Sequence, residues 1–221
     1  MLSDVDSTFA TQPHRSLYVA YLDILGFSNR ILCDFELALE TYEELLTTLN
    51  IFQAARPAAV ELHIASDSLV AVGEQLTPLL DFTSHLQWAT LLTNSLVRGG
   101  VAFGRHVEEQ GDRGFQIVSE ALVRAVRTEQ SVRYPCVALH DSVQPGPEHF
   151  GSPRQPNLER LVLFYQGRWI VNPFTIAWGT SARDRATFLA EEFPDYAQTY
   201  RWFIDLHRAV FSASPLLPGT D

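Results

Sequence analysis

The chain is poor in the residues that mark several protein classes. Its 221 residues include two cysteines, Cys33 and Cys136, with no Cys-x-x-Cys pair and no Cys/His ligand spacing. This pattern excludes a disulfide framework, gives no sign of a zinc site and fits a reducing compartment. The 16 basic residues are outnumbered by 26 acidic ones, for a net charge of −10. We therefore expect no stable binding to nucleic acid, which depends on clustered cations.

Long apolar runs are also missing. No stretch approaches the ~18 consecutive apolar residues of a membrane span, and the polar start of the chain lacks the basic and apolar blocks of a signal peptide. These absences predict a cytoplasmic protein with no membrane association. Residues 1–15 are predicted to be a flexible N-terminus. The 46% hydrophobic and 11% aromatic content is enough for one good-sized core.

Two aspartates are unusual because each lies beside a short apolar run. Asp23 ends the run Leu17–Leu22, and Asp67 lies in a Ser-Asp-Ser segment between two β-rich runs. A buried carboxylate costs several kcal/mol if it is charged and unpaired, and a divalent cation removes that cost. Carboxylate and carbonyl oxygens suit Mg²⁺ or Mn²⁺. The alternative that each aspartate only caps a turn or pairs with an arginine remains open.

The hydrophobic pattern predicts an α+β fold, a ferredoxin-like or palm-type β-α-β-β-α-β core. In this fold the first strand lies beside the central hairpin, so Asp23 and Asp67 are expected to meet at one point. The Gly-Phe-Ser turn after the first strand could direct backbone N–H groups at phosphate. The expected strands are Leu17–Asp23, Ala59–Ala65, Ser68–Val72, Arg98–Gly104 and Val132–Leu139, and the expected helices are Phe35–Phe52, Thr77–Leu96 and Ser119–Gln130.

The C-terminal third is predicted to add a hairpin and helices to this core. A Pro/Gly-rich loop over 140–156 precedes a hairpin with its tip at Gln166–Arg168, and helix follows from Ala182 to Phe211 with a break near Pro194. The aromatic residues of this helical region favour core or dimer packing. We expect a catalytic domain over 16–180 and a helical extension over 181–221 that packs on the same domain.

Four blocks resemble, in the same order, motifs of the class III nucleotidyl cyclases. Asp-Ile-Leu-Gly-Phe-Ser from Asp23 is similar to their Asp-Ile-x-Gly-Phe-Thr strand, and Asp67 stands at the spacing of their second metal ligand. Residues 98–104 resemble their Arg-x-Gly-Ile-x-x-Gly strand, and residues 121–129 resemble the following helix. With a late Val-Asn-Pro-Phe, the compact form is most similar to the pyrimidine cyclases of the Pycsar antiphage systems. The likeness covers residues 17–174.

This resemblance implies roles for individual residues. Two Mn²⁺ or Mg²⁺ ions would bind to Asp23, Asp67 and the backbone carbonyl of Ile24. Gly26, Phe27 and Ser28 would face the phosphates, and Arg127 would stabilise the transition state. Related enzymes are homodimers in which metal ligands come from one chain and base-reading and transition-state residues from the other. Without the family, Arg127 would be read as a solvated charge on a helix surface.

The positions that read the base depart from the purine cyclases of the family. His63 and Gln116 replace their lysine and aspartate, and Val123 replaces their helix asparagine. A neutral histidine or an amide can donate and accept hydrogen bonds at the O4 and N3 edge of a pyrimidine. His63 could equally be an ordinary half-buried histidine. The candidates for phosphate binding, which could instead form surface ion pairs, are Arg98, Arg105, Arg124 and Arg168.

The resemblance implies a metal-dependent cyclase that converts UTP to 3′,5′-cyclic UMP and pyrophosphate. It would act as a signal synthase in bacterial antiphage defence, and a separate effector protein would read the product. Three alternatives stay open: a cyclase of CTP or of a purine nucleotide, a catalytically silent nucleotide-binding module that dimerises, and a palm-fold interaction domain in which both aspartates are structural.

Overall fold

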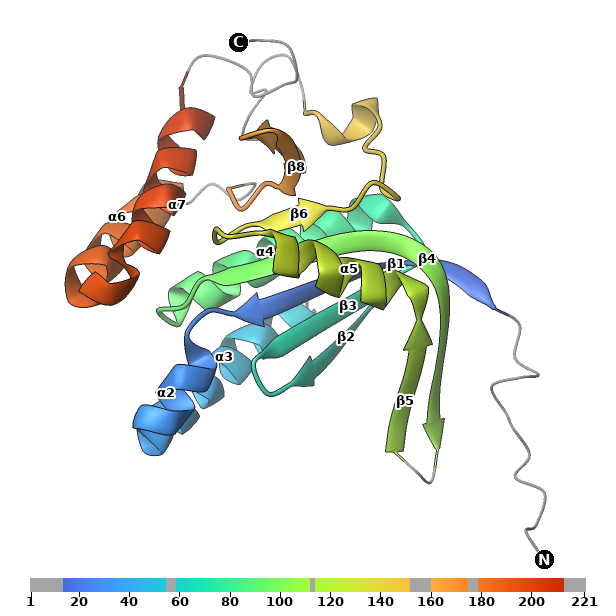
Figure 1. Cartoon of the computed structure of the whole chain (residues 1–221), viewed down its shortest axis with the longest axis horizontal. Helices are drawn as coiled ribbons and strands as arrows, with labels where there is room; N and C mark the ends of the chain where they lie inside the picture. The colour runs from blue at the N-terminus through green and yellow to red at the C-terminus, as the bar shows by residue number, and fades with distance from the viewer. Residues whose placement is uncertain (1–13, 55–58, 112–113, 152–159, 175–178, 213–221) are drawn as a thin grey trace, which may run out of the picture.

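The computed structural model describes residues 14–54, 59–111, 114–151, 160–174 and 179–212. Predictions for residues 1–13 and 213–221 lie outside these ranges. The chain forms a mixed α+β fold around an eight-stranded sheet with helices on both faces (Figure 1). The strand order is β2-β3-β1-β4-β6-β8-β7, and β5 pairs with the outer part of β4. Neighbouring strands are antiparallel except for β4 and β6, which are parallel.

The elements follow one another along the chain in an order that begins strand, helix, hairpin, helix, strand. The strands are β1 Arg15–Ile24, β2 Val60–Ala65, β3 Ser68–Gly73, β4 Val97–Gly111, β5 Gly114–Ser119, β6 Val137–Leu139, β7 Val162–Tyr165 and β8 Arg168–Val171. The α-helices are α2 Phe27–Cys33, α3 Phe35–Ala54, α4 Leu76–Leu92, α5 Glu120–Ser131, α6 Gly179–Glu192 and α7 Ala197–Val210, with 3₁₀ turns η1 Pro147–His149 and η2 Pro194–Tyr196.

The predicted palm core is confirmed. Strands β2, β3, β1 and β4 lie in the order expected of a ferredoxin-like sheet, with α3 before the β2–β3 hairpin and α4 after it. In the register of the sheet, Asp23 on β1 lies between Ser68 on β3 and Arg98 on β4. The first strand is therefore central, and Asp23 emerges beside the turn of the hairpin.

Alternation along β1 divides its side chains between two cores. Ala20 and Leu22 are fully buried in the cluster that includes residues of α3 and α4. Leu17 and Val19 point to the opposite face, where they pack with Ala121 of α5. Because successive strand residues alternate in direction, Asp23 lies on the α5 face of the sheet.

The two glycines after Arg98 allow close packing of the central strands and α5. A Cβ atom at Gly100 would collide with the backbone carbonyl oxygen of Ala125 and lie 2.8 Å from Cβ of Thr128. A Cβ atom at Gly99 would collide with the carbonyl oxygen of Tyr21. The Arg-Gly-Gly motif therefore lets α5 rest directly on β4 close to Asp23.

The C-terminal helices form a second core on the β6–β8 side of the sheet. Leu163, Ile170 and Phe174 pack there with Leu189 of α6 and Leu206 of α7. Of the predicted aromatic residues, Tyr200, Trp202 and Phe203 are buried, whereas Phe188, Phe193 and Tyr196 remain exposed. The helical region and its break near Pro194 match the prediction, and the break is the short η2 turn.

Several elements differ from the sequence-based prediction. Strand β6 is limited to Val137–Leu139, because Pro135 cannot donate a backbone hydrogen bond and follows a bend at Tyr134. Helix α4 ends at Leu92, and Asn94 has a left-handed φ of 60°. Strand β4 extends to Gly111 and pairs with β5, so the predicted 111–114 turn joins two strands of a projecting hairpin (Figure 1). Helix α2 and strand β5 were not predicted.

Candidate functional site

Asp23 and Asp67 are brought together at the end of β1. The backbone N–H of Ile24 donates a hydrogen bond of 2.8 Å to the carbonyl oxygen of Asp67, which joins the end of β1 to the β2–β3 turn. Ser66, the residue before Asp67, has a left-handed φ of 55° that tightens this turn. Both aspartate side chains are partly buried. The topology thus places two carboxylates, 44 residues apart in sequence, at one site.

The charge at this site is predominantly negative. Burial, and after it the nearby carboxylates of Asp67 and Glu129, raise the pKa of Asp23 to about 6, although Arg98 acts to lower it. The Arg98 guanidinium lies 3.7 Å from the Asp23 carboxylate and forms a close ion pair with Glu129. Asp23, Glu129 and Asp67 supply three carboxylates to the site against the one guanidinium of Arg98, which leaves an excess of negative charge. A divalent cation would neutralise that excess, so the donor set fits Mg²⁺ or Mn²⁺.

The turn that follows β1 begins a short helix. Gly26 has a left-handed φ of 77° and precedes Phe27, the first residue of α2, which is buried. Ser28 is exposed, and its hydroxyl donates a 2.5 Å hydrogen bond to Oδ2 of Asp67. The turn therefore lies directly against the second carboxylate, with the glycine supplying the backbone conformation.

The C-terminal extension packs against this turn. The Tyr196 ring of η2 lies so close that a Cβ atom at Gly26 would be 3.5 Å from it, and its hydroxyl accepts a 3.3 Å hydrogen bond from Nδ2 of Asn29. A pocket between the turn and α7 is lined by residues that include Leu25, Arg30 and Tyr200. The extension is thus in contact with the turn that follows β1.

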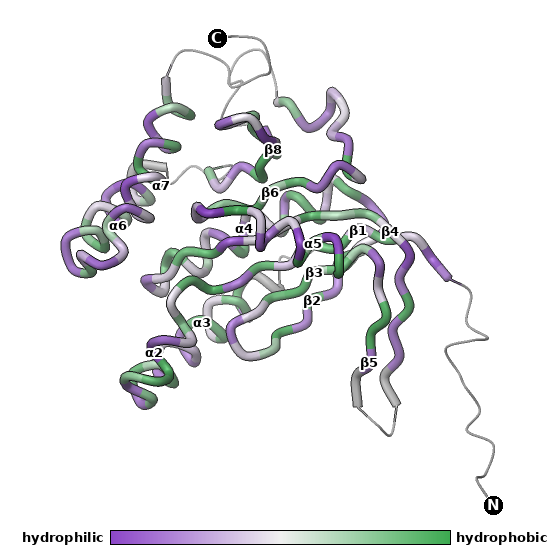
Figure 2. The backbone as a smooth tube through the Cα atoms, viewed as in Figure 1, coloured by the Kyte–Doolittle hydropathy of each residue, from purple (hydrophilic) through white to green (hydrophobic). Residues whose placement is uncertain are grey.

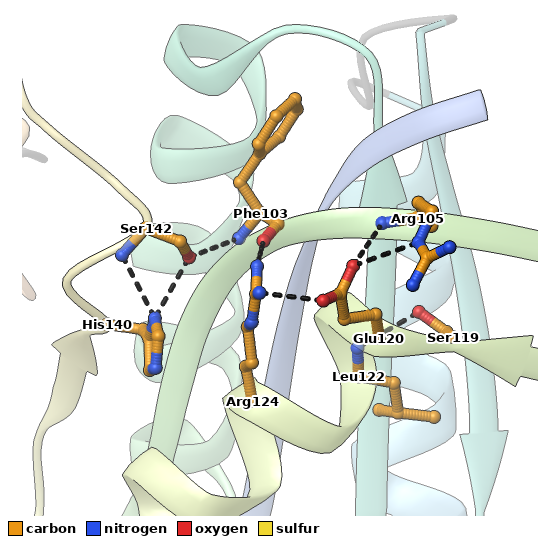
Figure 3. Close-up of polar contacts among 8 residues, drawn as sticks. All are labelled: Phe103, Arg105, Ser119, Glu120, Leu122, Arg124, His140 and Ser142. Atoms are coloured by element: carbon orange, nitrogen blue, oxygen red, sulfur yellow. Dashed lines mark hydrogen bonds and ion pairs between the residues drawn. The ribbon is translucent and has the colours of Figure 1, made fainter.

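Helix α5 is held on β4 by a polar network (Figure 3). Arg124 donates hydrogen bonds to the carbonyl oxygen of Phe103 and to Glu120, each 2.7 Å long. Glu120 accepts from the backbone and side chain of Arg105 at 3.3 and 3.4 Å. The Ser119 hydroxyl caps the helix by accepting from Leu122 N–H at 3.0 Å.

Beside that network, the loop after β6 is tied to the same strand. The Ser142 hydroxyl accepts a 2.9 Å hydrogen bond from the backbone N–H of Phe103, and the His140 ring lies 3.0 Å from that hydroxyl (Figure 3). Arg105 and Arg124, two of the predicted phosphate-binding arginines, therefore take part in structural contacts of α5. Arg98 is the one of the four candidates that the structure places beside Asp23.

Arg127 lies on the outward surface of α5. It is exposed, two residues before the buried Glu129 that contacts Arg98, and this separation turns the two side chains about 200° apart on the helix. Val123, one turn earlier, is 51% exposed on the same surface. Arg127 is consequently directed away from the Asp23 site of its own chain.

His63 lies on the edge strand β2 in a second polar cluster. Its Nε2 atom is 3.5 Å from Oε2 of Glu108, and the buried His106 ring bridges Glu108 at 3.1 Å and Ser119 at 2.9 Å. Burial alone would raise the pKa of Glu108, but hydrogen bonds with His106 and Glu61 and the charges of both imidazoles lower it. His63 lies two strands across and two residues along from Asp23, roughly 12 Å away.

Gln116 is on the projecting hairpin. It pairs with Glu109, eleven residues along β4 from Arg98, which corresponds to roughly 36 Å of strand. Figure 2 shows that this hairpin carries both hydrophilic and hydrophobic segments. The structure therefore does not bring Gln116 to the Asp23 site of the same chain.

Glu129 and Glu108 are site residues that the sequence reasoning did not single out. Glu129 follows Arg127 by two residues within the segment 121–129, and its position on the buried face of Ala121 and Ala125 was the available signal. No comparable signal marked Glu108, because its contact with His63 depends on how β4 curves beyond the predicted strand end.

Comparison with solved structures identifies the fold. A bacterial light-regulated adenylyl cyclase superposes with a TM-score of 0.53 and 11% sequence identity, covering 80% of this chain and 100% of that one. The guanylate cyclase domain of RhGC from Catenaria anguillulae in complex with GTP gives 0.49 and 14%, with 73% and 99% coverage. The guanylyl cyclase Cya2 gives 0.48 and 11%, with 61% and 87% coverage. No family model and no curated protein matches the chain.

The match to the light-regulated adenylyl cyclase shows that the chain has the fold of a nucleotide cyclase domain, which agrees with the class III resemblance of its motifs. Among the described residues, no helix has the length and apolar character needed to cross a membrane.

Proposed function

We propose that the protein is a class III nucleotide cyclase that converts UTP to 3′,5′-cyclic UMP and pyrophosphate. The observation that carries the cyclase assignment is the meeting of Asp23 and Asp67 at the end of β1, beside a glycine turn and within a cyclase fold. Burial and neighbouring negative charge raise the pKa of Asp23, and a cation bound beside this carboxylate would favour its ionised form.

In this proposal the chain's own residues bind and orient the triphosphate. Asp23, Asp67 and the Ile24 carbonyl would hold two Mn²⁺ or Mg²⁺ ions, which supply charge neutralisation of the triphosphate and activation of the 3′-hydroxyl. The backbone of Gly26–Ser28 would contact phosphate oxygens. Arg98, already paired with Glu129, keeps Asp23 in place and limits the repulsion between the carboxylates.

The transition-state and base-reading residues would act on the site of a second chain. Arg127 is turned away from Asp23 of its own chain, and Gln116 lies far along the hairpin. A two-fold homodimer places the same surface of each subunit against the other, so both groups can enter the partner's site. Arg127 would then stabilise charge on the leaving pyrophosphate.

The choice of UTP rests on His63 and Gln116. Neither residue offers the lysine ammonium and carboxylate of the purine cyclases, and both can pair with the O4 and N3 edge of uracil. The same groups can pair with cytosine, so cyclisation of CTP is the nearest alternative. A catalytically silent nucleotide-binding dimer is favoured by Val123, which cannot donate the hydrogen bond expected of the missing asparagine.

A nucleotide survey tests the proposal. The purified chain is incubated separately with each ribonucleoside triphosphate and Mn²⁺, and products are resolved by chromatography and mass. We expect cyclic UMP from the wild-type chain and none from Asp67→Ala, while Glu74→Ala, which removes an exposed surface carboxylate, keeps the activity.

Each remaining outcome identifies one alternative. Cyclic CMP or a cyclic purine nucleotide would replace the substrate assignment. Stoichiometric nucleotide binding by a folded dimer without pyrophosphate release would support the silent module. Absence of both turnover and Mn²⁺-linked stabilisation would leave the aspartates with a structural role. A role in antiphage signalling, with a separate effector for the product, is part of the proposal and would be tested by expressing the chain with its neighbouring genes during phage challenge.

A further inference from the structure

A second group of metal-ligating side chains lies outside the Asp23 site. Glu61 and His63 are on the edge strand β2. Their side chains point to the α5 face, because Leu62, which lies between them in the strand, points to the opposite face. Glu108 reaches them from β4. One ligand atom from each of the three residues lies within 4.8 Å of the others. The cluster therefore links the edge of the sheet to the base of the projecting hairpin.

The donor set contains two carboxylates and one imidazole. Glu61 and Glu108 each offer a carboxylate oxygen to the group, and a cation bound between two such oxygens offsets the repulsion between them. The imidazole of His63 adds a nitrogen ligand, which Mg²⁺ and Ca²⁺ disfavour and Zn²⁺ accepts.

Glu108 is already oriented for such a role. The His106 side chain is 1% exposed, and its Nε2 lies 3.1 Å from Oε2 of Glu108 while its Nδ1 contacts the Ser119 hydroxyl. A ligating carboxylate held by a buried hydrogen-bond partner is a recurrent feature of metal sites in proteins. Zinc bonds of about 2.0–2.2 Å place tetrahedral ligands roughly 3.4 Å apart, so small side-chain rotations would close the site.

We propose that Glu61, His63 and Glu108 form a zinc site separate from the two-aspartate site. The ion joins β2 to β4 at the base of the hairpin. A further consequence rests on the proposed function: because the ion takes the lone pair of His63, zinc withdraws this side chain from base reading and inhibits cyclisation of UTP.

The binding test uses the full chain with both Asp23→Asn and Asp67→Asn, which removes the proposed nucleotide-metal ligands. Zinc binding is measured by competition with a chromogenic chelator after EDTA treatment, and circular dichroism checks folding. We expect one Zn²⁺ per chain, and at least tenfold weaker binding when Glu61→Gln or His63→Gln is added. Glu109→Gln is the matched control, since this carboxylate is on the same strand and the opposite face.

Equal zinc affinity in all these folded variants, or no binding of Zn²⁺ in the parent, would overturn the site. Glu61 is exposed on an edge strand, so Glu61→Gln keeps the test decisive if His63→Gln fails to fold. Because this measurement needs no turnover, its failure is distinguishable from failure of the cyclase proposal. Inhibition is then measured on the chain with both aspartates, where zinc at one equivalent should lower cyclic UMP formation in the parent and not in Glu61→Gln.

Discussion

The guanidinium group of Arg98 lies 3.7 Å from the carboxylate of Asp23, on the strand next to it. Arg98 also pairs with the buried Glu129, so two carboxylates share one guanidinium group. Asp67 adds a third negative charge. This shared partner explains why the pKa of Asp23 is raised to about 6 by burial and by its acidic neighbours despite the arginine beside it.

The raised pKa predicts a pH-dependent effect of Asp23→Asn on stability. The folded state holds the Asp23 proton up to about pH 6, whereas the unfolded chain releases it near the ordinary value of 3.8. Ionisation of Asp23 therefore opposes folding increasingly between about pH 4 and pH 6, and fully above that range. We expect Asp23→Asn to raise the Tm of the metal-free protein at pH 7.5 and to change it little at pH 4.

Asp184→Asn is the control for that experiment, because Asp184 forms an exposed ion pair with Arg183 and such pairs contribute little. Equal Tm shifts from Asp23→Asn at both pH values would contradict the assigned pKa. Adding Mn²⁺ at pH 7.5 should stabilise the wild-type chain and not Asp23→Asn.

Mixing two inactive variants should restore activity if the site is shared between subunits. Asp23→Asn removes a metal ligand, and Arg127→Ala removes the residue that we place on the partner's site. A mixed dimer contains one site with both residues intact. If subunits exchange at random, about a quarter of wild-type activity should return, measured as cyclic UMP formation after co-incubation.

The matched control mixes Asp23→Asn with Asp67→Asn. Both substitutions fall on the same chain's ligand set, so no mixed dimer contains an intact site. Recovery in this control, or its absence in the first mixture under conditions of proven exchange, would argue against a site built from two chains.

Gly100→Ala should destabilise the fold severely. The added methyl group has no room, because the Ala125 carbonyl oxygen and Thr128 of α5 occupy its position. Overpacking of this kind costs about 1–3 kcal/mol or more, since neither backbone can move freely. Chemical denaturation should show the loss, and Gly73→Ala, whose nearest neighbours would lie at 3.2 and 3.5 Å, should show a smaller one. Similar losses in both variants would refute the close contact of α5 and β4.

His63→Ala should change the preference between UTP and CTP. The substitution removes the proposed base partner and leaves the Asp23 ligand set untouched, roughly 12 Å away in the same chain. We expect the ratio of kcat/KM values for UTP and CTP to shift by about tenfold, the effect of one lost hydrogen bond of about 1.4 kcal/mol. His85→Ala, which alters a partly buried histidine of α4, should leave the ratio unchanged. An unchanged ratio in His63→Ala would remove its base-reading role.

The sequence predicted the palm core because local patterns and topology agreed there. The apolar run of β1, the helical spacing of α3 and the β-rich hairpin each indicated one element, and the standard packing of such elements brought Asp23 to Asp67. The Arg-Gly-Gly motif was identified by resemblance alone. The physical reason for its glycines is the close approach of α5 to β4, which depends on contacts between residues distant in sequence.

The elements that were missed depend on context beyond a local window. Strand β4 continues past Gly104 because β5 returns to pair with it. The polar sequence of this segment does not by itself indicate a strand, since its strand propensity depends on the partner strand. Helix α2 is seven residues long and has one buried residue, Phe27, so its periodicity is too short to read. Glu108 became a neighbour of His63 only through the curvature of that extended β4 strand.

Strand β4 has a mechanical consequence. It is one uninterrupted ribbon of 15 residues that starts beside the carboxylate pair and ends at the tip of the projecting hairpin. The strand is paired with β1 over ten residues, from Val97 to His106, and with β5 alone from Val107 to Gly111. Bending of the projecting hairpin is therefore expected to occur beyond His106 and to leave the pairing of Arg98 with Asp23 unchanged.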